Sequence, residues 1–171
     1  DARGNRTEVP VRYALDTASR SYGFALGAYD RDRPLVIDPL LQSTYIGGSS
    51  ADYANSVAVH PVSGDVYVAG KATSSDFPKV TGSEQPTKSP GGTQGADAFV
   101  TRLNAALTSR LQSTYIGGDG DESILGVAIH PLNGDVYVAG WTTSSNLPKA
   151  AGSEQSTKAA GGTNGYDGFV T

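Results

Sequence analysis

The stretch LQSTYIGG stands at residues 41–48 and returns, letter for letter, at residues 111–118. The repetition continues towards the C-terminus at the same period of 70 residues. When residues 41–101 are aligned with residues 111–171, 38 of the 61 positions are identical. Self-similarity at a fixed period is the sequence signature of a repeat architecture. The chain is therefore expected to contain two copies of one structural unit.

The repeat divides the chain into three segments. We expect a small N-terminal β segment at residues 1–40, a first repeat at residues 41–110 and a second repeat at residues 111–171. The second repeat is expected to lack its last strand, because it contains no later counterpart of the LQSTYIGG stretch.

Composition favours an all-β chain and excludes several classes of protein. The 22 Gly suit tight turns, and the 9 Tyr, which outnumber the 4 Phe, suit short strands. The chain has no Cys, which excludes disulfides and thiolate metal sites. The net charge is −4 and no basic stripe occurs, so nucleic acid is not expected as a partner. No apolar run approaches the length of a membrane span.

The N-terminal segment predicts a small antiparallel sheet. Residues 9–15 are typical of a strand that Pro10 places at a sheet edge, and residues 21–29 alternate small and apolar side chains as a second strand. A charged turn at residues 30–34 leads to a short apolar strand at residues 35–37.

Each repeat predicts four strands separated by turn residues. In the first repeat, the first three are Ser56–His60, Asp65–Ala69 and Asp97–Leu103. The fourth is the stretch Gln42–Ile46, which ends at a Gly-Gly pair. The counterparts in the second repeat are Gly126–His130, Asp135–Ala139, the residues from Asp167 onwards, and Gln112–Ile116. A long polar connection at residues 73–95 separates the second strand from the third.

Four short antiparallel strands per unit, repeated head to tail, are typical of β-propeller blades. No helical periodicity appears between the strands, which disfavours a solenoid of alternating strands and helices. The predicted fold class is all-β, with propeller-type blades of four antiparallel strands preceded by a small antiparallel sheet.

Several motifs in a fixed order give the chain a family likeness. The run YDRDRPLVIDP at residues 29–39 leads into STYIGG, and SVAVHP, GDVYVAG, SSDFP and GGTQGADAFVTRL follow in that order. In this combination the chain resembles the bacterial SBBP repeat family, named for a seven-bladed β-propeller. It also resembles the short β-domain that commonly precedes those repeats, and the likeness covers residues 22–171. The resemblance implies a secreted or cell-surface protein and supplies no catalytic residues.

The two ends of the repeat region are complementary. The first repeat begins with a fourth strand that no first three strands precede, whereas the second repeat stops after its third strand. Unpaired strand edges need cover. Three arrangements remain open, namely a piece of one complete propeller, a ring closed by strand donation between copies, and a head-to-tail filament. The donated residues would be Gln42, Ser43, Thr44, Tyr45 and Ile46, and the accepting residues Phe169, Val170 and Thr171.

The densest acidic cluster is a candidate metal site. It contains Asp119, Asp121 and Glu122, and oxygen-rich loops of this kind can hold Ca²⁺. The equivalent residues of the first repeat, 49–52, lack most of these oxygen atoms. The alternative interpretation is a solvated turn after a Gly-Gly bend. No other cofactor is expected.

Histidines and aromatic residues complete the set of candidates. His60 and His130 each end a strand before a Pro, and we interpret them as side chains at the entry to a turn rather than as catalytic bases. The tyrosines that recur inside strands are interpreted as core residues between blades. Trp141 follows the second strand of the second repeat and is the best candidate for a ligand platform.

We expect a non-enzymatic, extracellular or cell-surface module with a structural or adhesive role. It would pair through its edges with copies of itself or with missing blades of a parent chain. Two alternatives remain open, namely a lectin-like propeller that binds surface glycans and a fragment of a larger secreted propeller enzyme. Because the chain contains no Met, residue 1 is not expected to be a translation start.

Overall fold

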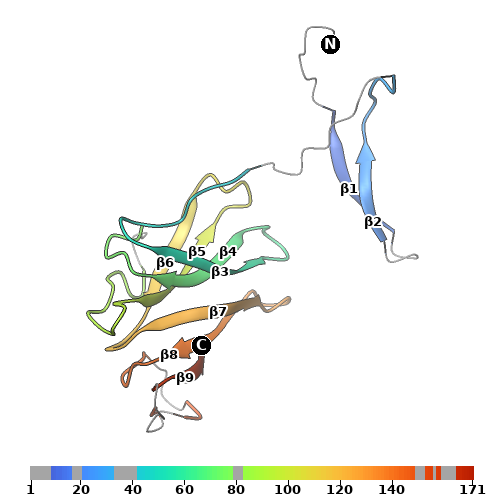
Figure 1. The fold of residues 1–171 in the computed structure, drawn as a ribbon. Helices are drawn as coiled ribbons and strands as arrows, with labels where there is room; N and C mark the ends of the chain where they lie inside the picture. The colour runs from blue at the N-terminus through green and yellow to red at the C-terminus, as the bar shows by residue number, and fades with distance from the viewer. Residues whose placement is uncertain are drawn as a thin grey trace. The chain divides into compact units, whose positions relative to one another are not determined.

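A computed structural model of the chain shows an all-β protein (Figure 1). It describes residues 9–16, 21–32, 42–78, 83–148, 153–155, 157–158 and 165–171. The chain forms two compact units, residues 1–41 and residues 42–171.

The first unit contains one antiparallel pair of strands. Strand β1 (Val11–Asp16) pairs with β2 (Ser21–Leu26), with Val11 opposite Leu26. The pairing continues one step beyond the strands, where the Gly27 amide donates to the Pro10 carbonyl at 2.7 Å. This confirms the first two strands of the predicted small antiparallel sheet, while the strand predicted at residues 35–37 lies outside the described residues.

The first large sheet is a complete four-stranded blade, called blade 1 below. Its strands are β3 (Asp52–Val59), β4 (Val66–Ala72), β5 (Asp97–Leu103) and β6 (Arg110–Ile116). They lie side by side in chain order, and every neighbouring pair is antiparallel. The last strand, β6, contains residues 111–116 of the second copy of the LQSTYIGG stretch, so the sheet extends past the boundary between the two sequence repeats.

The second large sheet, blade 2, has three strands. They are β7 (Glu122–Ile129), β8 (Val136–Thr142) and β9 (Asp167–Val170), again in chain order. The fourth predicted strand of the repeat region, Gln42–Ile46, carries no regular secondary structure in the single chain. That prediction is wrong for one isolated copy, because a strand needs a hydrogen-bonded neighbour and the described residues offer these five none.

Both blades contain the same β-bulge in their first strand. The register shifts between Ala54 and Ser56 in β3 and between Ile124 and Gly126 in β7. The bulge lets pairing continue towards the N-terminal side, so both strands begin four residues before the predicted start. The opposite glycine sits against the bulge, and a Cβ on Gly140 would lie 2.0 Å from the Ser123 carbonyl oxygen.

The two blades pack face to face through small and branched side chains. Ala69 and Ala98 of blade 1 are fully buried against Ile124 and Val138 of blade 2. The Asn55 side-chain amide of blade 1 also donates to the Ile124 carbonyl at 2.8 Å. The two alanines allow close approach of the sheets, so this inter-blade core is continuous between the two repeats.

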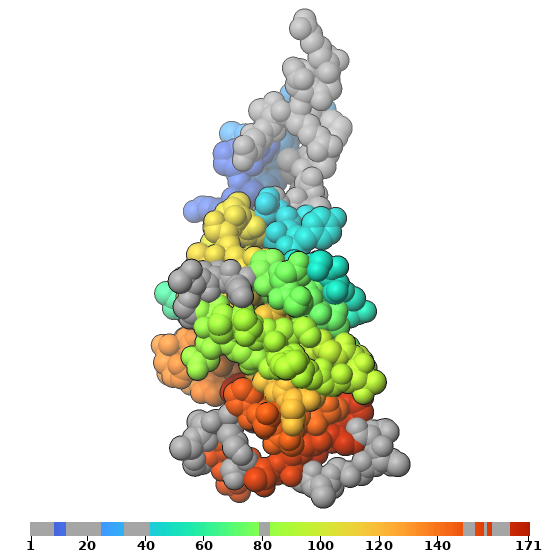
Figure 2. Space-filling view, turned by 90° about the vertical axis from the view of Figure 1, so that its left-hand side faces the viewer, coloured from blue at the N-terminus to red at the C-terminus, as the bar shows by residue number. Residues whose placement is uncertain are grey.

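A second core lies on the opposite face of blade 1. Phe77, from the connection between β4 and β5, lies over Phe99 with ring centroids 4.4 Å apart. Tyr115 of β6 completes this cluster, and its ring centroid lies 6.0 Å from that of Phe77. The long polar connection therefore covers part of its own blade rather than extending freely (Figure 2).

Substituting Gly140 tests the close approach at the bulge. We expect Gly140→Ala to lower the free energy of unfolding by about 1–3 kcal/mol, because the added methyl group meets backbone atoms that cannot rotate away. The control is Gly126→Ala in the facing strand, where an added Cβ has no atom within 4 Å. Thermal unfolding measures both, and equal losses in the two variants would contradict this account.

Candidate functional site

The Gly-Gly loop before each blade is held by a carboxylate and a serine. In front of blade 1, the Gly48 amide donates to Asp52 Oδ2 at 2.7 Å. The Ser50 amide donates to Ser74 Oγ at 2.8 Å, and this hydroxyl donates in turn to Asp52 Oδ2 at 2.6 Å. The loop is thus tied both to the start of β3 and to the turn that follows β4.

The same network recurs 70 residues later, in front of blade 2. The Gly118 amide donates to Glu122 Oε2 at 3.1 Å, and the Gly120 amide donates to Ser144 Oγ at 2.7 Å. The Ser144 hydroxyl donates to Glu122 Oε1. The first loop is exposed at Gly48, whereas Gly118 and Glu122 are buried because blade 1 covers them.

The predicted calcium ligands have separate partners in this network. Asp119 accepts hydrogen bonds from the amide and the hydroxyl of Ser145, and the hydroxyl is the main reason that its pKa lies below its ordinary value. Asp121 accepts from the amides of Gln94 and Ala96 in blade 1, each at 3.0 Å. The part of the chain that the structure describes brings no three acidic or histidine side chains together around one point. Calcium binding stays a prediction.

Asp97 is a buried carboxylate that the sequence analysis did not single out. Its Oδ2 atom accepts from the Ser89 amide at 2.8 Å and from Gln85 Nε2 at 3.0 Å. Its Oδ1 atom has no hydrogen-bond partner among the described residues. Burial raises the pKa of Asp97, and the charge of Glu122 raises it further. The only available signal was that an Asp recurs as the first residue of the third strand of each repeat.

Tyr115 fixes the outer strand of blade 1 to the turn after β4. Its side chain is 3% exposed, and its hydroxyl donates to the Ser74 carbonyl at 2.8 Å. The same hydroxyl accepts from the Phe77 amide at 3.2 Å. The Tyr115 amide donates to the Gln85 carbonyl at 3.1 Å, on the side of β6 that faces away from β5. We call this pocket for a tyrosine side chain the tyrosine slot.

The equivalent tyrosine before blade 1 is in the opposite situation. Tyr45 is fully exposed at 101%, although its neighbours in sequence are the same as those of Tyr115. Ile46 packs against the core that contains Phe99 and Tyr115, so the segment Gln42–Ile46 is held at its C-terminal end only. The structure therefore contains one copy of the stretch as a paired strand and one as an unpaired segment.

The accepting residues predicted from the sequence lie at an open sheet edge. Val138 and Thr171 exchange two backbone hydrogen bonds of 2.8 and 3.0 Å on the β8 side. On its other side, β9 has no strand partner among the described residues, and Val170 is 73% exposed. Within the second unit, Figures 1 and 2 place residues 42–50 at one end and β9 at the other.

Comparison with protein families agrees with this geometry. Residues 43–78 match a family described as the SBBP beta-propeller repeat, and residues 1–40 match a domain of unknown function, DUF7948. The chain carries an SBBP beta-propeller repeat. The matched segment runs from the first Gly-Gly loop through β3 and β4 to the Ser74 turn, so it contains the complete first network. A search of the curated proteins found no match.

The histidines of both blades have a structural role. His60 Nδ1 accepts from the amides of Val62 and Ser63, each at 3.2 Å. His130 Nδ1 accepts from the equivalent amides in blade 2, at 3.3 and 3.4 Å. These contacts close the turn between the first two strands of each blade. They agree with the interpretation of the two histidines as side chains at the entry to a turn.

Trp141 has an aromatic partner that sequence reasoning missed. It lies in β8 opposite Gly168, and its ring meets that of Tyr166 edge-on at 4.9 Å between centroids. Tyr166 is 51% exposed. The first repeat has Lys71 and Ala96 at these two positions. The signal that could have identified the pair was that both positions become aromatic in the second repeat.

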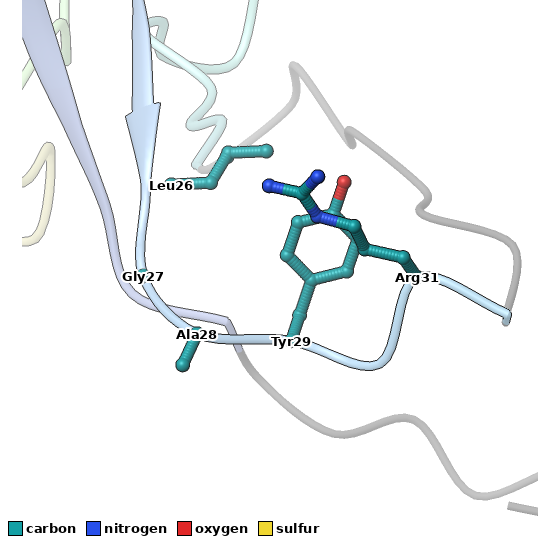
Figure 3. Close-up of a pocket in the computed structure, with 5 residues that line it drawn as sticks. All are labelled: Leu26, Gly27, Ala28, Tyr29 and Arg31. Atoms are coloured by element: carbon teal, nitrogen blue, oxygen red, sulfur yellow. The ribbon is translucent and has the colours of Figure 1, made fainter.

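Described residues of the first unit, which matches the DUF7948 domain, line an open hollow (Figure 3). It is lined by the consecutive stretch Leu26–Tyr29 and by Arg31. The side chains of Leu26, Tyr29 and Arg31 point towards the same space. The described residues also contain no helix with the length and hydrophobicity needed to cross a bilayer.

Asp97→Asn tests the buried carboxylate. Because the pKa of Asp97 is raised in the folded protein, its contribution to stability is full at low pH and is lost as the pH rises through that pKa. We expect the free energy of unfolding of the variant, relative to that of wild type, to increase as the pH rises above about 4, the ordinary pKa of an Asp side chain. Urea unfolding at several pH values measures it.

The control for losing one negative charge is Asp135→Asn, at an exposed turn. If the two variants show the same dependence of unfolding free energy on pH, burial is not what raises the pKa of Asp97.

Proposed function

We propose that the chain is a non-enzymatic structural module of an extracellular or cell-surface protein, and that its copies associate by strand donation. The observation that supports this most strongly is the duplicated stretch. Residues 112–116 belong to the paired outer strand of blade 1, in which Ser113 and Tyr115 are buried, whereas residues 42–45 of the identical segment 42–46 lie exposed. The open edge of β9 is the kind of edge that such a strand covers.

The use of the titratable side chains supports a structural role. The Nδ1 atoms of both histidines accept turn amides. The buried carboxylate of Glu122 accepts from Gly118 and from the Thr142 and Ser144 hydroxyls, so its oxygen atoms maintain the fold. An extracellular location agrees with the absence of Cys and with the long Ser- and Thr-rich connections.

A carbohydrate-binding function is the second candidate. The pair Trp141 and Tyr166 places two aromatic rings together at the end of blade 2, and Tyr166 is half exposed. Aromatic side chains with one apolar face and one polar edge suit contact with sugar rings. Blade 1 has no equivalent pair, so the site would be specific to the second repeat.

The particle mass in solution tests self-association. We expect light scattering to give a multiple of the 17.6 kDa chain mass, and deletion of residues 42–46 to return the particle to a single chain. Gln42→Ala is the control and should keep the wild-type mass, because it keeps the backbone of the segment and changes a side chain that is exposed here and also at its counterpart Gln112. A wild-type particle of one chain mass at every concentration would refute the proposal.

A glycan array tests the second candidate. We expect Trp141→Ala to weaken binding to the preferred glycan by about tenfold, the loss typical of an aromatic residue at the centre of a contact. Tyr53→Ala is the matched control, since Tyr53 is an aromatic residue of blade 1 that is 54% exposed. Absence of binding to any glycan, or equal losses in both variants, would exclude a lectin role for this pair.

A further inference from the structure

We infer that His60 is a pH-sensitive latch, whose neutral imidazole holds the first turn of blade 1 closed and against the matching turn of blade 2. The first turn of blade 1 is the connection between β3 and β4, residues 60–65, and the matching turn of blade 2 is residues 130–135. Protonation of the ring would release both contacts. The inference goes beyond the structural role proposed above, because it makes part of that role depend on pH within a single chain.

The hydrogen bonds of His60 fix which of its nitrogens carries the proton. Nδ1 accepts from the amides of Val62 and Ser63, both at 3.2 Å. A nitrogen that accepts has a free lone pair, so the single proton of the neutral ring is on Nε2. A protonated imidazole carries a hydrogen on both nitrogens and accepts from neither side. The gain of one proton therefore removes both hydrogen bonds and places an N–H group against two amide N–H groups.

His130 repeats this arrangement in blade 2. Its Nδ1 atom accepts from the amides of Leu132 and Asn133 at 3.3 and 3.4 Å. In both turns the histidine carbonyl also accepts from the amide of the glycine four residues later, at 3.0 Å. The side chains at the second and third positions of the two turns differ, yet the contacts of the imidazole are the same. The acceptor role of Nδ1 is therefore a property of the turn and not of its particular side chains.

The other edge of the His60 ring lies on the turn of blade 2. A Cβ on Gly134 would lie 2.6 Å from His60 Nε2 and 3.5 Å from His60 Cδ2. Gly134 has a φ of +77°, a conformation that favours glycine, so this residue supplies both the turn and the space for the ring. One imidazole thus contacts the turns of both blades, and a change at Nδ1 reaches the contact between them.

Charged groups around the latch influence the pH at which it opens. Asp65, at the end of the same turn, is bound to Arg102 of β5, whose Nε atom donates to it at 2.9 Å. This hydrogen bond is the main reason that the pKa of Asp65 lies below its ordinary value, and the charge of His60 contributes less. The titratable groups of the blade 2 turn are His130 and Asp135, and Asp135 is exposed. The two carboxylates attract an imidazolium ion, but neither restores an acceptor at Nδ1.

The direction of the pH effect follows from the form of the imidazole that the fold binds. The folded chain binds the neutral ring, and an ordinary histidine gains its proton near about pH 6.5. The stabilisation by the latch is therefore full above that pH and is lost as the pH falls below it. Asp97 acts in the opposite direction, because its raised pKa favours the folded state at low pH. Substitution at His60 separates the two effects.

The variant His60→Asn tests the latch, because Asn keeps an acceptor that does not titrate. Its side-chain oxygen can accept from amides two and three residues later, as in an Asx-turn. We expect the unfolding equilibrium constant of wild type, relative to that of His60→Asn, to rise about tenfold between about pH 7.5 and about pH 5, the effect of losing two ordinary hydrogen bonds. Urea unfolding of the full 171-residue chain, at one protein concentration, measures it.

The matched control is His60→Ala, which lacks the acceptor at every pH. Its unfolding equilibrium constant should exceed that of His60→Asn by the same factor at both pH values. A ratio between wild type and His60→Asn that does not change with pH would overturn the latch. This outcome would leave the proposed self-association untouched, because the particle mass at neutral pH does not depend on it.

Nuclear magnetic resonance of the wild-type chain tests the latch without any substitution. We expect the nitrogen shift of His60 Nδ1 to be that of an unprotonated acceptor at about pH 7.5. As the pH falls, the amide protons of Val62 and Ser63 should move upfield with the same midpoint as the ring, and the amide of Gly134 should move with them. A proton on Nδ1 at neutral pH, or turn amides that do not follow the ring, would overturn the latch. A Gly134 amide that stays unchanged would overturn its connection to blade 2.

Discussion

The structure depends on hydrogen bonds from glycine amides to one acidic side chain in front of each blade. Gly48 donates to Asp52, and Gly118 donates to Glu122. Each acid also accepts from a serine of the turn after the second strand, 22 residues further along the chain, so the network joins the loop to that turn. A carboxylate that accepts several amide and hydroxyl hydrogens forms charge-assisted bonds, so this small network fixes where one blade ends and the next begins.

Blade 1 and blade 2 differ in what surrounds this network. Residues 91–96, in the connection before β5, lie against the second loop, and Asp121 accepts from the amides of Gln94 and Ala96 there. The first loop has Ala51 at the corresponding position and remains exposed. Within the acidic cluster that resembles a cation site in sequence, Asp121 is thus the residue that accepts from the backbone next to the neighbouring blade.

Much of the fold could be predicted from the repeat and from strand periodicity, but the site could be predicted only in part. The bounds of β5, Asp97–Leu103, are those that the alternation of residues indicates. The early start of β3 could not be foreseen, because a bulge interrupts the alternation on which strand prediction relies. The strand predicted at Gln42–Ile46 is absent in one copy because pairing depends on a neighbour, which no local pattern encodes. The buried Asp97 and the partner of Trp141 were missed because each depends on contacts between distant segments.

The outer strand of blade 1 comes from the beginning of the following sequence repeat. A duplication of one whole 70-residue unit would therefore supply three strands to a new sheet and one strand to the sheet before it. The number of incomplete edges would stay the same however many units were gained or lost. Proteins of this construction can change length in evolution by whole units without creating a new exposed edge at each step, which removes the main hazard of enlarging a β-sheet protein.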